Sequence, residues 1–168
     1  MLLEFRFQNY KSFRDEVRFS MTAAPKQKGL DYSLSTVKKQ GKGLKALCSS
    51  VIYGSNAAGK TTVVGAMDTF RSIVLRGNIR NSEDFSSPNH AASDLSLIPN
   101  QMLAKAAPVC FYIDFVYQQY RIQYGLTLDL GLFLDAKYQR KVLSETLTVN
   151  GARIFTREQP DSPSTGLN

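Results

Sequence analysis

Apolar and polar residues alternate at the start of the chain, with Leu3, Phe5 and Phe7 on one side of an expected strand. A period of two residues is typical of a half-buried β-strand. The pattern breaks after Gln8 and resumes over residues 16–21. We therefore predict that these two segments form an antiparallel pair.

In the middle of the chain the apolar residues recur three or four positions apart, at Val63, Met67, Phe70 and Val74. That spacing predicts a helix over residues 62–76, and Gly77 is a good residue for its end. The short apolar segment 48–53, ahead of this helix, predicts a buried strand.

Two hairpins are predicted in the second half of the chain. One joins residues 109–117 to residues 120–128 through a two-residue tip, which is too short for a parallel crossover. The other joins residues 142–149 to residues 152–155 through Asn150-Gly151. Asn-Gly favours a tight type I′ turn, because both of its central residues need a positive φ. The second half is therefore expected to be antiparallel sheet.

The segment between the expected strand and the helix matches the pattern G-x-x-x-x-G-K-S/T, as Gly54-Ser55-Asn56-Ala57-Ala58-Gly59-Lys60-Thr61. Such a loop turns backbone N–H groups towards a phosphate, and the helix N-terminus adds partial positive charge. We expect Lys60 to contact the β- and γ-phosphates of ATP, and the Thr61 hydroxyl to bind Mg²⁺. Thr62 completes this phosphate loop. The alternative is a glycine-rich turn that caps an ordinary αβ unit.

Four segments carry a family resemblance: Phe7-Gln8-Asn9-Tyr10-Lys11-Ser12-Phe13, residues 53–62, residues 111–115 with 120–126, and residues 143–147 with Asn150-Gly151. In this order they resemble the N-terminal lobe of an ABC-type ATPase head, as in SMC, RecF and OLD-like proteins. The chain is more closely similar to the "AAA family ATPase" proteins of bacterial anti-phage and abortive-infection systems. The resemblance implies an α/β fold of α+β character, and ATP-driven dimerisation in DNA metabolism or phage defence.

The resemblance also implies contacts outside the phosphate loop. In the family, the segment that matches residues 9–13 lies near the adenine and ribose, which makes Lys11 and Ser12 candidate nucleotide contacts. The alternative for Lys11 is a solvent-facing turn residue. Gln101 stands near the place of a glutamine that contacts Mg²⁺ and water in ABC-type heads. Its alternative role is that of a solvated loop residue.

Hydrolysis by such heads needs an Asp for Mg²⁺ and a Glu to activate water. Asp114, Asp129 and Asp135 end apolar segments, but none is followed by Glu, so we interpret them as strand-end or turn acids. His90 is interpreted as a surface residue. The resemblance places the missing acids in a C-terminal lobe. We therefore expect a fragment, a truncated gene product or a split subunit that binds ATP without turning it over efficiently.

We expect one domain over residues 1–158 and a frayed tail over residues 159–168. The domain is expected to contain the phosphate loop at 54–62, a long loop at 78–107 with a short helix near 101–104, and antiparallel strands at 109–157. Two alternatives stay open. One is a non-catalytic interaction or regulatory module. The other is a small-molecule P-loop kinase, which needs an arginine-rich lid, whereas residues 78–107 contain only Arg80.

The net charge of +7 arises entirely in residues 1–60, which hold eleven Lys or Arg and four Asp or Glu. Six lysines crowd the connection over residues 22–46, at Lys26, Lys28, Lys38, Lys39, Lys42 and Lys45. They suggest contacts with nucleic-acid phosphates, or simply a solvated loop.

The remaining composition favours a cytoplasmic protein. The sequence contains no apolar run of about 18 residues, so no membrane partner is expected. Its start lacks the pattern of a signal peptide. Cys48 and Cys110 lie in predicted strands, where we expect buried free thiols.

Overall fold

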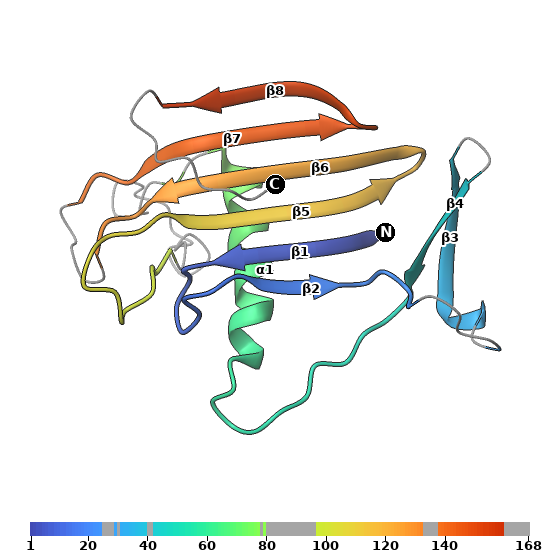
Figure 1. The fold of residues 1–168 in the computed structure, drawn as a ribbon, viewed down its shortest axis with the longest axis horizontal. Helices are drawn as coiled ribbons and strands as arrows, with labels where there is room; N and C mark the ends of the chain where they lie inside the picture. Colours follow the sequence, from blue (N-terminus) through green and yellow to red (C-terminus); the bar gives the residue numbers. More distant parts are fainter. Residues whose placement is uncertain are drawn as a thin grey trace, which may run out of the picture.

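The computed structural model describes residues 1–24, 29, 31–39, 42–77, 79, 97–132 and 138–159. In these residues the main feature is a six-stranded sheet in the order β2-β1-β5-β6-β7-β8, in which every neighbouring pair is antiparallel. One α-helix, α1, lies behind the sheet and crosses its strands (Figure 1). The described part is thus a mixed α/β structure, mostly antiparallel sheet with one helix.

The strands of this sheet are β1 (Leu2–Gln8), β2 (Val17–Ser20), β5 (Val109–Tyr117), β6 (Tyr120–Asp129), β7 (Lys141–Val149) and β8 (Ala152–Glu158). The other elements are the 3-10 helix η1 (Asp31–Ser33), the strands β3 (Leu34–Lys39) and β4 (Lys42–Leu47), and the helix α1 (Lys60–Arg76). β3 and β4 form a separate two-stranded sheet beyond one end of the large one (Figure 1).

β1 lies inside the sheet, between β2 and β5. Its alternation places Leu3, Phe5 and Phe7 in the core, and each of these side chains is buried. The predicted antiparallel pairing of β1 with the next strand is confirmed, with Phe5 opposite Phe19. β1 is also the element that carries the chain directly into the 9–13 turn, which is important for the site.

Both predicted hairpins are confirmed. β5 and β6 turn at Gln118 and Gln119, and Gln118 has a φ of 53°. β7 and β8 turn at Asn150 and Gly151, with φ values of 54° and 84°. Two consecutive positive φ values are what a type I′ turn requires, so the Asn-Gly pair explains this connection.

The helix α1 confirms the predicted helix and its end. It begins two residues before the predicted start and ends at Arg76, as predicted. Gly77 caps this end, and its N–H donates to the carbonyl of Ile73 at 2.9 Å. Gly77 has a φ of 67°, as a glycine at a helix end commonly does. Val74, one of the residues whose spacing predicted the helix, is 49% exposed, whereas its neighbour Ile73 is buried.

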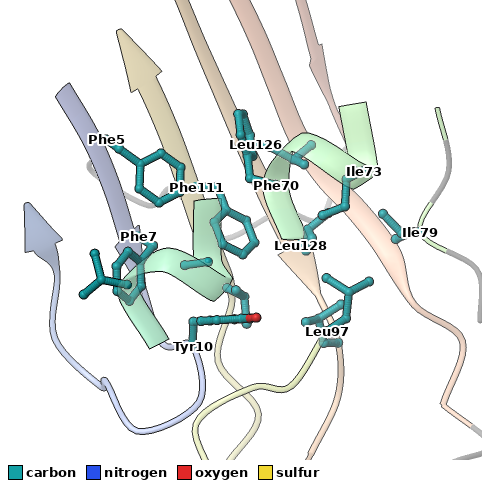
Figure 2. Close-up of a cluster of buried hydrophobic side chains, with 14 residues drawn as sticks. Phe5, Phe7, Tyr10, Phe70, Ile73, Ile79, Leu97, Phe111, Leu126 and Leu128 are labelled. Atoms are coloured by element: carbon teal, nitrogen blue, oxygen red, sulfur yellow. The ribbon is translucent and has the colours of Figure 1, made fainter. Parts of the chain in front are cut away.

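The core lies between α1 and the inner face of the sheet. Figure 2 shows Phe70 of α1 among the side chains that the strands contribute. Its ring centroid lies 5.8 Å from that of Phe5 and 5.8 Å from that of Phe111. Burial of each such aromatic ring stabilises the fold by about 1.5–3 kcal/mol. These contacts fix α1, and with it the phosphate loop, against the sheet.

The lysine-rich connection contains a hairpin that the sequence pattern did not predict. β3 and β4 pair over their whole length, from Leu34 opposite Leu47 to Lys39 opposite Lys42. Ala46 is fully buried and belongs to a small apolar cluster with Leu3. The pattern did not predict these strands because the many Lys and Gly residues interrupt the alternation of apolar and polar positions.

The predicted buried strand at residues 48–53 is wrong. Val51 is 82% exposed and Tyr53 is 90% exposed. In the described part of the chain no strand pairs with this segment, so its backbone stays outside the sheets. Cys48 is accordingly exposed and not in a strand, whereas Cys110 is buried in β5 as expected.

The long loop is described only at residue 79 and over residues 97–107. The short helix predicted near residues 101–104 is wrong, because those residues form a turn followed by a bend. Proline residues at 99 and 108 disfavour a helix here. The side chain of Asn100 also favours a turn, because it donates to the carbonyl of Lys11 and accepts from the N–H of Met102. Apart from residue 159, the predicted tail lies outside the described residues.

Candidate nucleotide-binding site

The phosphate loop runs directly into α1. Gly59 occupies the N-cap position with a φ of 86° and a ψ of 9°, and Ala57 has a φ of 63°. Glycine adopts this left-handed backbone without the steric cost that a Cβ brings. Residues 54–58 are exposed, so the loop presents its backbone to solvent at the positive end of the helix.

Lys60 lies across the loop. Its Nζ donates to the carbonyl oxygen of Gly54 at 3.0 Å and to that of Ser55 at 2.7 Å. The ammonium charge is thereby held at the loop. Thr61 is exposed in the first turn of the helix, and Thr62 is half-buried. This arrangement fits a bound polyphosphate, because a cation and backbone N–H groups lie together at a helix N-terminus.

The opening motif touches the phosphate loop through Phe13. A Cβ atom placed on Gly59 would lie 2.5 Å from Cζ of the Phe13 ring. The ring also packs edge-on against Phe7, with centroids 5.5 Å apart. Two motifs about fifty residues apart in the sequence are therefore in contact in the fold.

Lys11 lies beside α1 in a constrained backbone. Its φ is 50°, its N–H donates to the carbonyl of Ile98 at 2.9 Å, and its carbonyl accepts from Asn100 Nδ2 at 2.9 Å. The Nζ atom is 4.0 Å from the position of a Cβ on Gly65. A non-glycine residue in this conformation persists only where its surroundings hold it there. Ser12 is exposed next to it.

Asn9 and Asn100 connect the opening motif to the segment before β5, and sequence reasoning missed both. Asn9 Nδ2 donates to the carbonyls of Ala107 at 2.6 Å and Pro108 at 3.2 Å, and the Asn100 N–H donates to the Asn9 carbonyl at 3.1 Å. Both asparagines are buried. The signal in the sequence was the N-x-K motif itself, since Asn tolerates a positive φ. Gln101 follows Asn100 and is exposed.

The interpretation of Asp114 as a strand-end or turn acid is wrong. Asp114 lies in the middle of β5 and is 5% exposed. Its carboxylate accepts three hydrogen bonds from Arg121, from Nε to Oδ1 at 3.0 Å, from Nε to Oδ2 at 3.2 Å and from Nη2 to Oδ2 at 2.5 Å. The hydrogen bond to Asp114 raises the pKa of the Arg121 guanidinium, while burial acts in the opposite direction. Asp114 is therefore engaged in a structural ion pair.

Asp129 confirms its interpretation as a strand-end acid. It is the last residue of β6 and accepts from the N–H of Gly131 at 3.1 Å and from Tyr138 Oη at 2.5 Å. Asp135 and His90 lie outside the described residues, as does Arg80. Within the described ranges no group of three or more His, Cys, Asp or Glu side chains gathers as metal ligands.

Four of the six lysines of the connection lie in the hairpin of β3 and β4. Lys38, Lys39 and Lys42 occupy strand positions at its closed end, where residues 39 and 42 face each other. Lys45 Nζ lies 3.4 Å from a carboxylate oxygen of Asp31, and both side chains are exposed. Lys26 and Lys28 lie outside the described residues.

Comparison with known families decides the class of this site. The sequence profile of the family described as "AAA domain, putative AbiEii toxin, Type IV TA system" matches residues 49–165. The chain belongs to this AAA family. The match covers more than half of the 168 residues and includes the whole phosphate loop, so the AAA family implies ATP binding here.

The match to the AAA family begins after the opening motif, residues 7–13, and does not include it. What connects this motif with the matched region is the contact of Phe13 with the phosphate loop. No curated protein matches the chain. No solved structure matches it either. Among the helices of the described residues, none has the length and apolar character to cross a membrane.

Proposed function

We propose that this chain is the ATP-binding lobe of an SMC/OLD-like ATPase that acts in the cytoplasm, in DNA metabolism or phage defence. The observation that carries the proposal is the Lys60 ammonium held across an exposed glycine loop at the N-terminus of α1. Membership in the AAA family supports it independently. The finer assignment to SMC/OLD-like proteins rests on the opening motif and on the antiparallel sheet.

Each residue of the site has a defined part in binding. Backbone N–H groups of the phosphate loop, residues 54–62, and the ammonium of Lys60 hold the phosphates. Thr61 supplies a hydroxyl ligand to Mg²⁺, with Gln101 as the second protein contact. When bound, the metal neutralises charge on the β- and γ-phosphates. Lys11 and Ser12 contact the nucleoside, and the position of Lys11 beside the first turns of α1 supports this role.

Efficient hydrolysis in this proposal needs a second lobe that supplies the acidic pair. Exposed apolar surface before the phosphate loop and along α1 supports such a partner, since large apolar patches mark interaction sites. Val51 and Tyr53 precede the phosphate loop, and Val64 and Leu75 of α1 are also exposed. A groove of about 540 Å³, lined almost entirely by apolar side chains, lies between α1 and strands β1, β5, β6 and β7. A second lobe, or a second copy of the chain, would cover this surface.

Titration calorimetry with ATP·Mg²⁺ tests the proposal. Replacing Lys60 by Ala removes a charge-assisted contact worth about 1.5–3 kcal/mol, so we expect affinity to fall about 10-fold or more. Lys45→Ala is the matched control, because Lys45 lies on the separate hairpin and pairs with Asp31. Equal binding by wild type and Lys60→Ala would contradict the proposal and favour a non-catalytic interaction module.

The same preparation tests the need for a second lobe. We expect ATP turnover by this chain alone to be far below about 1 s⁻¹, the lower end for complete enzymes. A turnover at or above that rate would show that the chain supplies its own acidic residues.

A further inference from the structure

Phe13 fills the space that a side chain at position 59 would need. The nearest ring atoms, Cζ and Cε2, lie 2.5 and 2.7 Å from the position of a Cβ on Gly59. Real Cβ atoms do not approach carbon this closely, so the Phe13 ring can occupy this position only because residue 59 has no side chain. Gly59 is thus constrained twice, by its φ of 86° and by the ring packed on it.

From this contact we infer that Phe13 is a positioning residue for the phosphate loop. Its ring supports Gly59 from the side of the sheet and holds the loop in the conformation that presents its N–H groups. The inference rests on the proposed function, because it concerns how the same site keeps its affinity for ATP.

The turn that carries Phe13 is fixed by its own backbone. The N–H of Tyr10 donates to the Phe13 carbonyl at 2.9 Å, and the N–H of Phe13 donates to the Tyr10 carbonyl at 3.0 Å. These two bonds close the turn. The ring is further held by its edge-on contact with Phe7, which is buried in the sheet.

A second set of bonds fixes the turn from the other side. Lys11 bonds to Ile98 and Asn100 through its backbone, and Asn100 in turn donates to the carbonyl of Asn9. Asn100 is buried, so loss of its side chain leaves the Lys11 carbonyl without this donor. The segment around Asn100 is therefore connected to the phosphate loop by contacts that run through the 9–13 turn.

The turn meets α1 at three successive places. Phe13 packs on Gly59, the Lys11 ammonium lies beside Gly65, and Tyr10 Oη lies 3.0 Å from Thr69 Oγ1. Contacts spread along more than two helical turns set both the position and the direction of the helix start. A small displacement of the helix start moves the N–H groups that bind phosphate, and such errors are costly in a preorganised site.

The decisive comparison is Phe13→Ala against Phe19→Ala. Both phenylalanines are half-buried and pack on the same core cluster, but only Phe13 touches Gly59. We expect both variants to lower the Tm, and only Phe13→Ala to weaken ATP·Mg²⁺ binding, by about 5- to 10-fold. We expect Phe13→Leu, which keeps part of the apolar bulk beside Gly59 but not the ring, to weaken binding less than Phe13→Ala does. Equal affinities for Phe13→Ala and Phe19→Ala would overturn the inference.

Hydrogen exchange separates this inference from the proposed function. In the nucleotide-free protein, we expect the amides of Ala58, Thr62 and Val63, which donate to the carbonyls of Ser55 and Gly59, to exchange faster in Phe13→Leu than in Phe19→Leu. Both leucine variants keep an apolar side chain, so the comparison stands if the alanine variants fail to fold. If wild type binds no ATP but this difference appears, the proposed function fails and the positioning role holds. Unchanged exchange in Phe13→Leu, with ATP binding intact in wild type, would overturn the positioning role alone.

Asn100→Ala provides an independent check of the connection. Because Asn100 acts through the same turn, we expect its effect on ATP affinity to be non-additive with that of Phe13→Ala. Full additivity of the two losses would show that the turn does not transmit the effect.

Discussion

Tyr10 and Thr69 lie 59 positions apart in the chain, and their hydroxyl oxygens are 3.0 Å apart in the buried core. This bond joins the 9–13 turn to the middle of α1. It is a polar contact in a largely aromatic core, and polar contacts of this kind specify one packing arrangement when they are satisfied.

We expect Tyr10→Phe to lower the free energy of unfolding by about 1 kcal/mol, the typical net value of such a bond. Thr69→Val should cost a similar amount, and the double variant should cost less than the sum of the two. Urea unfolding of the four proteins measures this cycle. Tyr32→Phe is the control, since Tyr32 is exposed. Additive losses would mean that the two hydroxyls do not interact.

The ion pair between Asp114 and Arg121 should affect stability and not nucleotide binding. Arg121→Ala leaves a buried carboxylate without its main partner, and we expect a loss of about 2 kcal/mol, less than for a fully buried pair because Arg121 is partly exposed. Denaturant unfolding measures the loss, and titration with ATP·Mg²⁺ provides the second reading. A fall in ATP affinity in the folded variant would give Asp114 a role at the site.

Tyr124 makes the fold sensitive to alkaline pH. Burial, and then the hydrogen bond to Glu145, raise the pKa of Tyr124 above its ordinary value. Because the folded state holds this proton more tightly, the contribution to stability is full below a pH of about 10 and is lost as pH rises through the folded pKa.

We therefore expect the unfolding free energy to decline above a pH of about 10, and the decline to be shallower in Tyr124→Phe. Unfolding by urea at several alkaline pH values measures the slope. Tyr117→Phe removes an exposed hydroxyl and should leave the slope unchanged. An identical slope in wild type and Tyr124→Phe would contradict this assignment.

The lysine-rich hairpin of β3 and β4 should bind nucleic acid weakly and in a salt-dependent way. If about two to four phosphates are neutralised, the slope of log K against log salt should be roughly −2 to −4. Fluorescence anisotropy with a labelled duplex measures it. Replacing Lys39 and Lys42 by Ala should reduce the slope, whereas Lys141→Ala, outside the hairpin, should not. Absence of binding at about 50 mM salt would return these lysines to the role of solvated residues.

The parts of the fold that depend on local signals were predictable. The alternation of Phe5 and Phe7, the spacing of Val63 and Phe70, and the Asn150-Gly151 turn each specify structure over a few residues. Confirmation of these elements shows that in each case the local preference and the tertiary packing agree.

The segments whose structure depends on distant partners were not predictable in this way. Residues 48–53 have the composition of a buried strand, but a strand also needs neighbours for its N–H and C=O groups. The contact between Phe13 and Gly59 could not be predicted either, because nothing in either motif specifies that the other lies against it. The phosphate loop could be recognised from its own residues, whereas the turn that supports it could not.

The strand order has a consequence for the newly made protein. β1 is synthesised before its neighbour β5, which comes from the second half of the given sequence, with Phe5 opposite Ile113. Until β5 to β8 leave the ribosome, β1 can pair only with β2, and α1 has no sheet to cover. We therefore expect the antiparallel strands β5 to β8 to form first by local contacts, and β1 to join them afterwards at the entropic cost of a long loop. Until that step the apolar side of β1 stays accessible, so a nascent chain of this protein is a natural client for chaperones.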